Sequence, residues 1–187
     1  GTGRFVLQCA IGGDEQQFGA MGQSLRERAV RFESGLRTVR ALLAGDEVDD
    51  PDGPWSLRGA RISPTPPEPV EVWIGGAGSK ALARAARMGD TWYAGPELTD
   101  EDARTKLAEY LDHGPTPPCL PLRRDVHVAA DDVEVARVRA AVEATGHRGF
   151  DLSALVIGTA DQVAERFLRC GAAGFDEIVV RQLVPDQ

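Results

Sequence analysis

Lysine is scarce in this sequence, and no basic cluster replaces it. Of the 21 basic residues among 187, only Lys80 and Lys106 are lysines, and 29 acidic residues bring the formal net charge to −8. Binding a nucleic-acid backbone needs clustered positive side chains that displace counterions. The arginines here are scattered among acids, so the composition argues against a nucleic-acid partner and against a basic membrane-binding stripe.

Cysteine and long apolar runs are also scarce. The three cysteines, Cys9, Cys119 and Cys170, lie far apart and in no CxxC or Cys/His spacing. An odd number without such spacing fits neither a disulfide framework nor a zinc site, so we expect buried free thiols and no metal. No run approaches the roughly 20 apolar residues of a membrane helix, and no leader-like segment opens the sequence. We therefore expect a cytoplasmic protein.

What is present is an alternation of short apolar runs with amphipathic segments. Five core strands are predicted, at Arg4–Ile11, Val70–Ile74, Thr91–Ala94, Asp125–Ala130 and Glu177–Leu183. Helices are predicted at 24–43, 80–88, 100–111, 132–145 and 160–170, with a link or short strand at 150–157. Strands separated by helices pair in parallel through right-handed crossovers, so the sequence predicts an α/β fold. Five strands do not close an eight-stranded barrel.

The first long helix has a clear start signal. Ser24 followed three residues later by Glu27 is a capping-box signature for a helix that runs to about Leu43. Its apolar residues recur every three or four positions, which predicts one face against a core. They are Leu25, Ala29, Phe32, Leu36, Val39 and Leu43. Residues 45–69 contain six prolines and read as a connection with little regular structure, with a short hairpin through Trp55 and Leu57 as an option.

The segment VWIGGAGSKALARAARMGD carries the sharpest functional signal. A buried strand runs directly into Gly75–Ser79 and then into a helix N-terminus, where bare backbone N–H groups and the helix dipole favour an anion. The spacing is neither the G-x-G-x-x-G of a dinucleotide fold nor a Walker loop, because Ser79 and Lys80 stand in the wrong order. From these residues alone, phosphate binding and a merely tight turn are equal alternatives.

Several segments, taken in order, resemble one known family, the luciferase-like monooxygenase superfamily. They are GRFVLQCAIGG, QQFGAMG, LRERAVRFESGLRTVRALL, ISPTPPEPVEVWIGGAGSKALARAARMGDTWYAG and VIGTADQVAERFLRCGAAGFDEIVVR. The resemblance covers nearly the whole chain. It implies a (β/α)8 TIM barrel represented by strands four to eight, within a single, N-terminally incomplete domain over residues 1–187. It also implies FMN or the 5-deazaflavin coenzyme F-420 as cofactor.

The resemblance assigns roles to specific residues. It implies that the cofactor phosphate is held by Gly75, Gly76, Ala77, Gly78 and Ser79, chiefly through the N–H of Gly76 and the N–H and hydroxyl of Ser79.

A second loop is implied at Gly12 and Gly13, with residues 14–18 after it, at the C-terminal end of a barrel strand. For Gln16, Gln17 and Phe18, an exposed turn with one anchoring aromatic is an equal alternative. Trp92 ends the strand that follows the phosphate loop, where it either faces the cofactor or serves as a core aromatic.

The chain departs from the family pattern at its start. Gln8 and Cys9 stand where the family tends to have glycine and an aliphatic residue, and the family's first three strands would precede Gly1. Those strands normally supply substrate contacts and often the catalytic His or Glu. We expect none of the histidines to be a catalytic base, so the catalytic residues stay unassigned. The histidines are His113, His127 and His147.

Two functions are consistent with these features. The first is a flavin- or deazaflavin-dependent oxidoreductase or monooxygenase that acts on a small organic substrate by hydride transfer or flavin–oxygen chemistry. The alternative is a truncated, non-catalytic relative that binds a flavin-like ligand or a partner chain. Because an open sheet exposes strand edges, we also expect a homodimer or a complementary chain that covers the edge.

Overall fold

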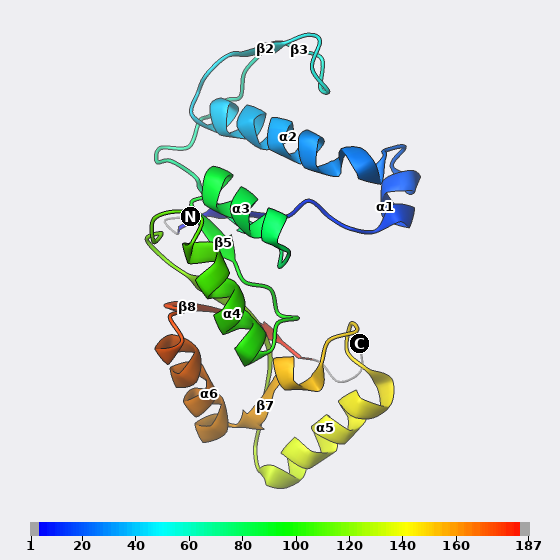
Figure 1. Ribbon diagram of the computed structural model, residues 1–187, viewed down its shortest axis with the longest axis vertical. Coiled ribbons are helices and arrows are strands. Elements are labelled where there is room, and N and C mark those ends of the chain that lie inside the picture. Colours follow the sequence, from blue (N-terminus) through cyan, green and yellow to red (C-terminus); the bar gives the residue numbers. More distant parts are fainter. Residues whose placement is uncertain (1–3, 184–187) are drawn as a thin grey trace. The chain divides into compact units, whose positions relative to one another are not determined.

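A computed structural model describes residues 4–183 of the chain. The chain divides into two compact units, residues 1–73 (the first unit) and residues 74–187 (the second unit). In Figure 1 the first unit runs from blue to cyan, and the second from green to red.

The first unit contains one long helix and few strands. Its elements are β1 (Val6–Cys9), α1 (Glu15–Ala20), the 3-10 turn η1 (Leu25–Glu27), α2 (Arg28–Leu43), β2 (Val48–Asp50), β3 (Leu57–Ala60) and the start of β4 (Glu71–Gly75). β1 neighbours β4, and the Cys9 thiol donates to the carbonyl oxygen of Trp73 at 3.7 Å. Arg4 pairs with the carboxylate of Glu71 at 2.7 Å.

Two local predictions in the first unit need correction. Residues 15–20 form helix α1 and not a loop or turn, because the Asp14 side chain accepts the N–H of Gln17 and caps a first turn. The Ser24 hydroxyl caps η1 through the N–H of Arg26, whereas α2 begins after Glu27 without a side-chain cap. Ser24 therefore marks the start of the short 3-10 turn and not of the long helix.

The hairpin option for residues 45–69 is confirmed. β2 and β3 pair antiparallel, with Val48 opposite Ala60 and Asp50 opposite Leu57. The predicted apolar stripe of α2 is less buried than expected, since Leu36 is its only fully buried member.

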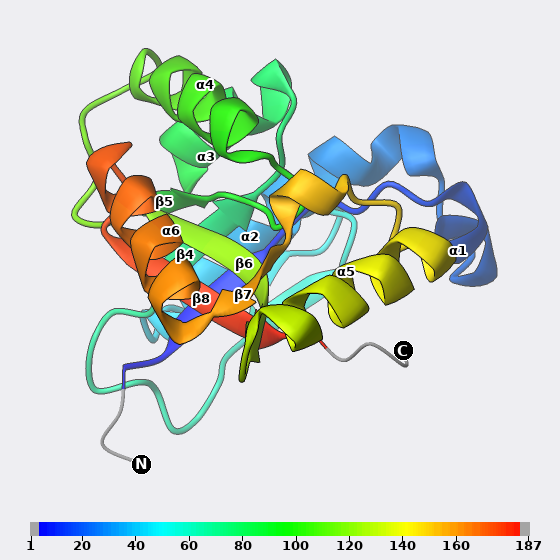
Figure 2. The same cartoon turned by 90° about the horizontal axis from the view of Figure 1, so that it is seen from below.

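The second unit continues the alternation of strands and helices (Figure 2). Its elements are α3 (Ser79–Met88), β5 (Thr91–Tyr93), α4 (Asp100–Leu111), β6 (Pro121–Ala129), α5 (Asp132–Thr145), the 3-10 turn η2 (Leu152–Ala154), β7 (Val156–Thr159), α6 (Ala160–Ala172) and β8 (Glu177–Gln182). β6 begins at Pro121 rather than Asp125, because its first residues pair with β8. None of the helices in residues 4–183 is long and apolar enough to cross a membrane.

The strands of the second unit pair in parallel around β6. β6 pairs with β8 from Pro121 to Val126, and with β7 from Val126 to Ala129. A parallel bridge between Ala94 and Leu122 joins the end of β5 to β6, and β5 neighbours β4. The predicted parallel α/β fold is therefore confirmed, and no closed barrel is found among the strands of residues 4–183.

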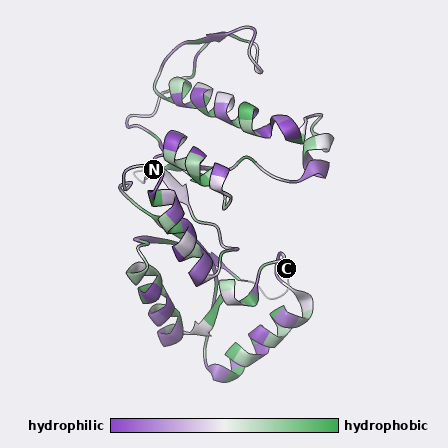
Figure 3. Cartoon of the chain, in the orientation of Figure 1, coloured by the Kyte–Doolittle hydropathy of each residue, from purple (hydrophilic) through white to green (hydrophobic). Residues whose placement is uncertain are grey.

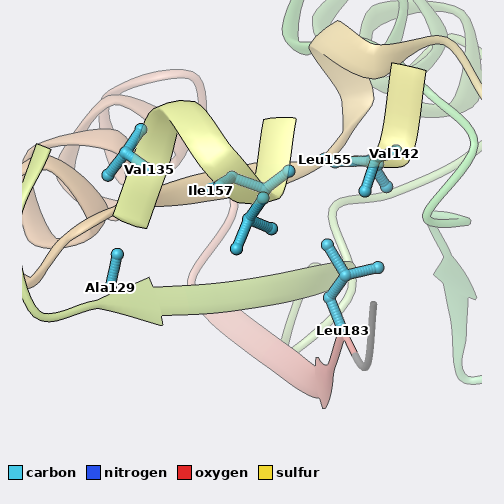
Figure 4. Packing of buried hydrophobic residues seen from close by; sticks show 7 residues of the cluster. Ala129, Val135, Val142, Leu155, Ile157 and Leu183 are labelled. Atoms are coloured by element: carbon cyan, nitrogen blue, oxygen red, sulfur yellow. The ribbon is translucent and has the colours of Figure 1, made fainter. Parts of the chain in front are cut away.

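The core of the second unit lies under α5 and α6. Valines of α5 at helical spacing pack with residues of β6 and β7, and Figure 4 shows two of them, Val135 and Val142, within this cluster. The buried cluster is Ala129, Val135, Val138, Val142, Leu155, Ile157 and Leu183. A second cluster joins Val126 and Val156 to Val163 of α6. Figure 3 shows hydrophilic and hydrophobic residues alternating along both helices, as a one-sided core requires.

Candidate phosphate-binding loop

The predicted anion loop connects β4 to α3. β4 ends at Gly75, directly after the buried residue Ile74. α3 begins at Ser79, and its N-cap Gly78 supplies no side-chain hydrogen bond. The N–H groups of Ala81 and Leu82 donate to the Gly78 oxygen at 2.7 and 3.1 Å. The N–H groups of Ser79 and Lys80 come before the first backbone hydrogen bond of α3, and both residues are exposed. This arrangement offers two donors and the positive end of a helix dipole to an anion.

Gly76 is required by the backbone of this loop. Its φ of 137° lies in a region of backbone conformation that residues other than glycine rarely adopt. An added Cβ would lie 2.7 Å from the Cβ of Ala81, which is closer than real contacts allow. The loop therefore keeps its shape, and its open approach, only with glycine at this position.

Trp92 fixes the loop from the protein interior. Its indole N–H donates to the Gly76 oxygen at 2.8 Å, and its side chain is 1% exposed. The ring packs against Tyr110 and Phe175, with centroids 5.7 and 6.4 Å away. Trp92 thus occupies the position of a core aromatic, from which it orients the loop.

One residue of α4, Glu109, contacts the loop, and sequence reasoning did not assign it to the site. The Glu109 carboxylate accepts hydrogen bonds from the Lys106 ammonium, at 2.8 Å, and from the Ser79 hydroxyl, and these bonds hold the pKa of Glu109 below its usual value. The Ser79 hydroxyl, predicted as a phosphate donor, is therefore engaged with a carboxylate. Lys80 lies in the first turn of α3. No local sequence pattern links Glu109 to Ser79.

Gly12 and Gly13 belong to the first unit, so their predicted action together with Gly75–Ser79 stays a prediction. Gly12 has a φ of 68°, and the Phe18 ring would lie 3.1 Å from an added Cβ. Its carbonyl oxygen accepts from the Arg28 guanidinium at 3.2 Å. The turn before α1 is thus built tightly around glycine.

His147 has a role that its sequence position did not indicate. Its Nε2 lies 2.9 Å from the carboxylate of Asp125, which is fully buried in β6. Arg123 and Arg148 reach the same carboxylate at 3.2 and 3.7 Å. This cluster ties the segment after α5 to the central strand.

His127 lies 3.3 Å from the Glu134 carboxylate. The expectation that no histidine is a catalytic base stays a prediction.

Comparison with known proteins identifies the family. The model of the luciferase-like monooxygenase family matches residues 1–153, and the chain belongs to that family. The predicted resemblance to the luciferase-like monooxygenase superfamily is therefore confirmed.

Two relatives show what share of each chain the sequence similarity covers. An F-420-dependent glucose-6-phosphate dehydrogenase from Beutenbergia cavernae is 33% identical over 88 residues, which are 45% of this chain and 26% of that protein. An uncharacterised protein of Mycobacterium tuberculosis is 29% identical over 86 residues, 46% of this chain and 30% of that protein. The matched regions thus span less than a third of either relative.

Solved structures share the fold. An F-420-dependent secondary alcohol dehydrogenase, in complex with an F-420–acetone adduct, superposes with a TM-score of 0.72 at 17% identity, covering 97% of this chain and 64% of that one. The EDTA monooxygenase from Chelativorans sp. gives a TM-score of 0.63 at 18% identity, covering 94% and 60%. The chain therefore spans less than two thirds of these enzymes.

Proposed function

We propose that the chain supplies the phosphate-binding part of a flavin- or deazaflavin-dependent oxidoreductase acting on a small organic molecule. The observation that carries the proposal is the exposed N-terminus of α3, which follows a buried strand and has glycine as its N-cap. Gly75–Ser79 hold the phosphate, with N–H donors from Ser79 and Lys80, and glycine at position 76 keeps the loop in this shape.

The protein's own residues bind and orient the cofactor. When bound, the cofactor ring supplies the hydride-transfer or oxygen chemistry. Trp92 keeps the Gly76 peptide in place through its indole N–H. The Ser79 hydroxyl, which contacts Glu109, would be a further donor to the phosphate, and Lys106 pairs with that carboxylate.

Coenzyme F-420 is the first cofactor to test and FMN the second. F-420 appears in the names of three similar proteins, the two dehydrogenases above and a tetrahydromethanopterin reductase from Methanopyrus kandleri. A riboflavin lyase crystallised with modified FMN has a TM-score of 0.59 and motivates the second cofactor.

The test is a fluorescence titration of the parent and of Gly76→Val with both cofactors. The added side chain clashes with Ala81 and does not tolerate the φ of 137°, so the loop distorts and its N–H donors are displaced. We expect binding to weaken by about 2 kcal/mol or more, roughly 30-fold. Gly171→Ala is the matched control, because a Cβ there meets nothing within 4 Å. If Gly76→Val binds both cofactors as tightly as the parent does, the loop assignment is wrong.

A further inference from the structure

The N-terminus of α3 contacts a negatively charged side chain of the neighbouring helix. Glu109 of α4 accepts a hydrogen bond from the hydroxyl of Ser79, the first residue of α3. Both helices belong to the second unit and pack against each other. Lys106 lies 2.8 Å from the same carboxylate, and hydrogen bonds from Lys106 and Ser79 hold the pKa of Glu109 below its usual value. The carboxylate is therefore ionised at neutral pH, beside the proposed phosphate site.

The Ser79 hydroxyl connects this carboxylate to the phosphate site. A hydroxyl has one proton, which it donates either to Glu109 or to a phosphate. A phosphate on the N–H of Ser79 is separated from Glu109 by one serine side chain and two hydrogen bonds of about 3 Å each. The two negative groups thus lie within the screening length of about 10 Å in 0.1 M salt. Glu109 therefore competes with a bound phosphate for the hydroxyl proton and also repels it.

The strength of this repulsion depends on the charge of the phosphate. A phosphomonoester carries about −1.5 to −2 charges at pH 7, because its second pKa is about 6. A phosphodiester lacks the second ionisable group and carries one negative charge. Lys80, Lys106 and the dipole of α3 attract both kinds of ester. Glu109 opposes that attraction, and it opposes the binding of the dianion more strongly.

We propose that Glu109 is a specificity-determining residue of the phosphate loop, which disfavours a phosphomonoester dianion more than a phosphodiester monoanion. The proposal rests on the proposed function, because it needs the cofactor phosphate to lie at the N-terminus of α3. It deepens that function by naming the class of cofactor. F-420 carries its phosphate as a diester and FMN as a monoester, so Glu109 favours the deazaflavin over the flavin.

The test compares two ligands that differ only in the phosphate. They share the ring that the parent binds in the titration above, flavin or deazaflavin, and carry a 5′-phosphate (the monoester) or its methyl ester (the diester). Fluorescence titrations are made at about pH 8, where the monoester is a dianion, and at low salt. Glu109→Gln keeps the size and an acceptor oxygen for Ser79 but removes the charge. We expect its affinity for the monoester to rise by about threefold or more relative to its affinity for the diester.

Two further variants of α4 separate charge from structure. Lys106→Gln removes the partner of the Glu109 carboxylate, so it should shift the preference in the opposite direction, toward the diester, by about twofold or more. Glu101→Gln is the matched control, because it removes the same charge from an exposed position about two turns, or 12 Å, before Glu109. It should leave the ratio of the two affinities within about 1.5-fold of the parent's, because exposed charges at that distance are largely screened.

The outcomes distinguish this proposal from the proposed function. A parent that binds neither ring overturns both. If the parent binds a ring and Glu109→Gln changes the affinity for the two esters equally, the specificity role is wrong while the loop assignment stands. A shift of the ratio in the same direction by Glu109→Gln and Lys106→Gln, or an equal shift by Glu101→Gln, would also overturn the role of Glu109.

Discussion

The two units use similar helical patterns with different outcomes. On α5 of the second unit, Val135, Val138 and Val142 are all buried against β6 and β7. On α2 of the first unit, Phe32, Leu36 and Val39 repeat at comparable spacing, yet Leu36 alone is buried and Val39 is 37% exposed. An apolar stripe on a helix thus shows which face can be buried, whereas the neighbouring elements decide whether that face is buried.

The two units also differ in whether their charged and polar groups are held by buried partners. The second unit buries the Asp125 carboxylate beside Arg123 and His147, and it holds the Gly76 loop through a buried indole. The arginines of α2 in the first unit border a cavity. We therefore expect mutations to be costly in the second unit and mild in the first, and the following experiments test that contrast.

The largest effect is expected for Asp125→Ala. The variant leaves Arg123 and His147 without their buried carboxylate, and breaking such a cluster costs about 3–5 kcal/mol of unfolding free energy. Urea denaturation followed by circular dichroism measures it. Glu143→Ala on exposed α5 surface is the control and should stay within about 0.5 kcal/mol. A loss below 1 kcal/mol for Asp125→Ala would show that the cluster is not essential to the second unit.

Truncating the hydrophobic core tests the contrast between the units directly. Leu155→Ala removes a side chain that is 2% exposed, and should cost about 3 kcal/mol through lost burial and a cavity. Val39→Ala in the first unit should cost under about 1 kcal/mol, because that side chain already contacts solvent. Equal losses in urea denaturation would contradict the different packing of the two units.

Trp92→Phe tests whether the core of the second unit positions the phosphate loop. The variant keeps an aromatic ring but loses the indole N–H bonded to the Gly76 oxygen, which should cost about 1 kcal/mol of stability. Cofactor binding should weaken several-fold, because the loop is less fixed. Thermal unfolding and the cofactor titration measure the two effects, and unchanged cofactor affinity would remove Trp92 from the site.

The smallest effect is a pH dependence that resides in the second unit. Burial acts to raise the pKa of Asp100, but hydrogen bonds and charge from Arg166 and Arg124 outweigh it, so the pKa is lowered. A depressed folded pKa adds stability above the unfolded pKa, which is lost as pH falls below about 4. Asp100 is 41% exposed, so we expect under about 1 kcal/mol. Asp100→Asn should flatten the acid limb of stability against pH; an unchanged limb would contradict this origin.

Local signals predicted much of the second unit correctly. The bounds of α4 and α5 agree with their predicted ranges, since Thr99 and Asp131 cap them. The start of β6 was misplaced, because Pro121 looks like a linker residue although it pairs at the first position of a strand. In the first unit, the capping motif at Ser24 was real but belonged to a shorter turn.

The sequence by itself determined the parallel α/β alternation and the passage from a buried strand through Gly75–Ser79 to a helix N-terminus, because strand, glycine and helix signals are local. Only the tertiary structure decided that Glu109 contacts Ser79, and that His147 pairs with Asp125. Such contacts join residues that lie 22 or more positions apart, and their geometry depends on how whole helices and strands pack, which local periodicity does not encode.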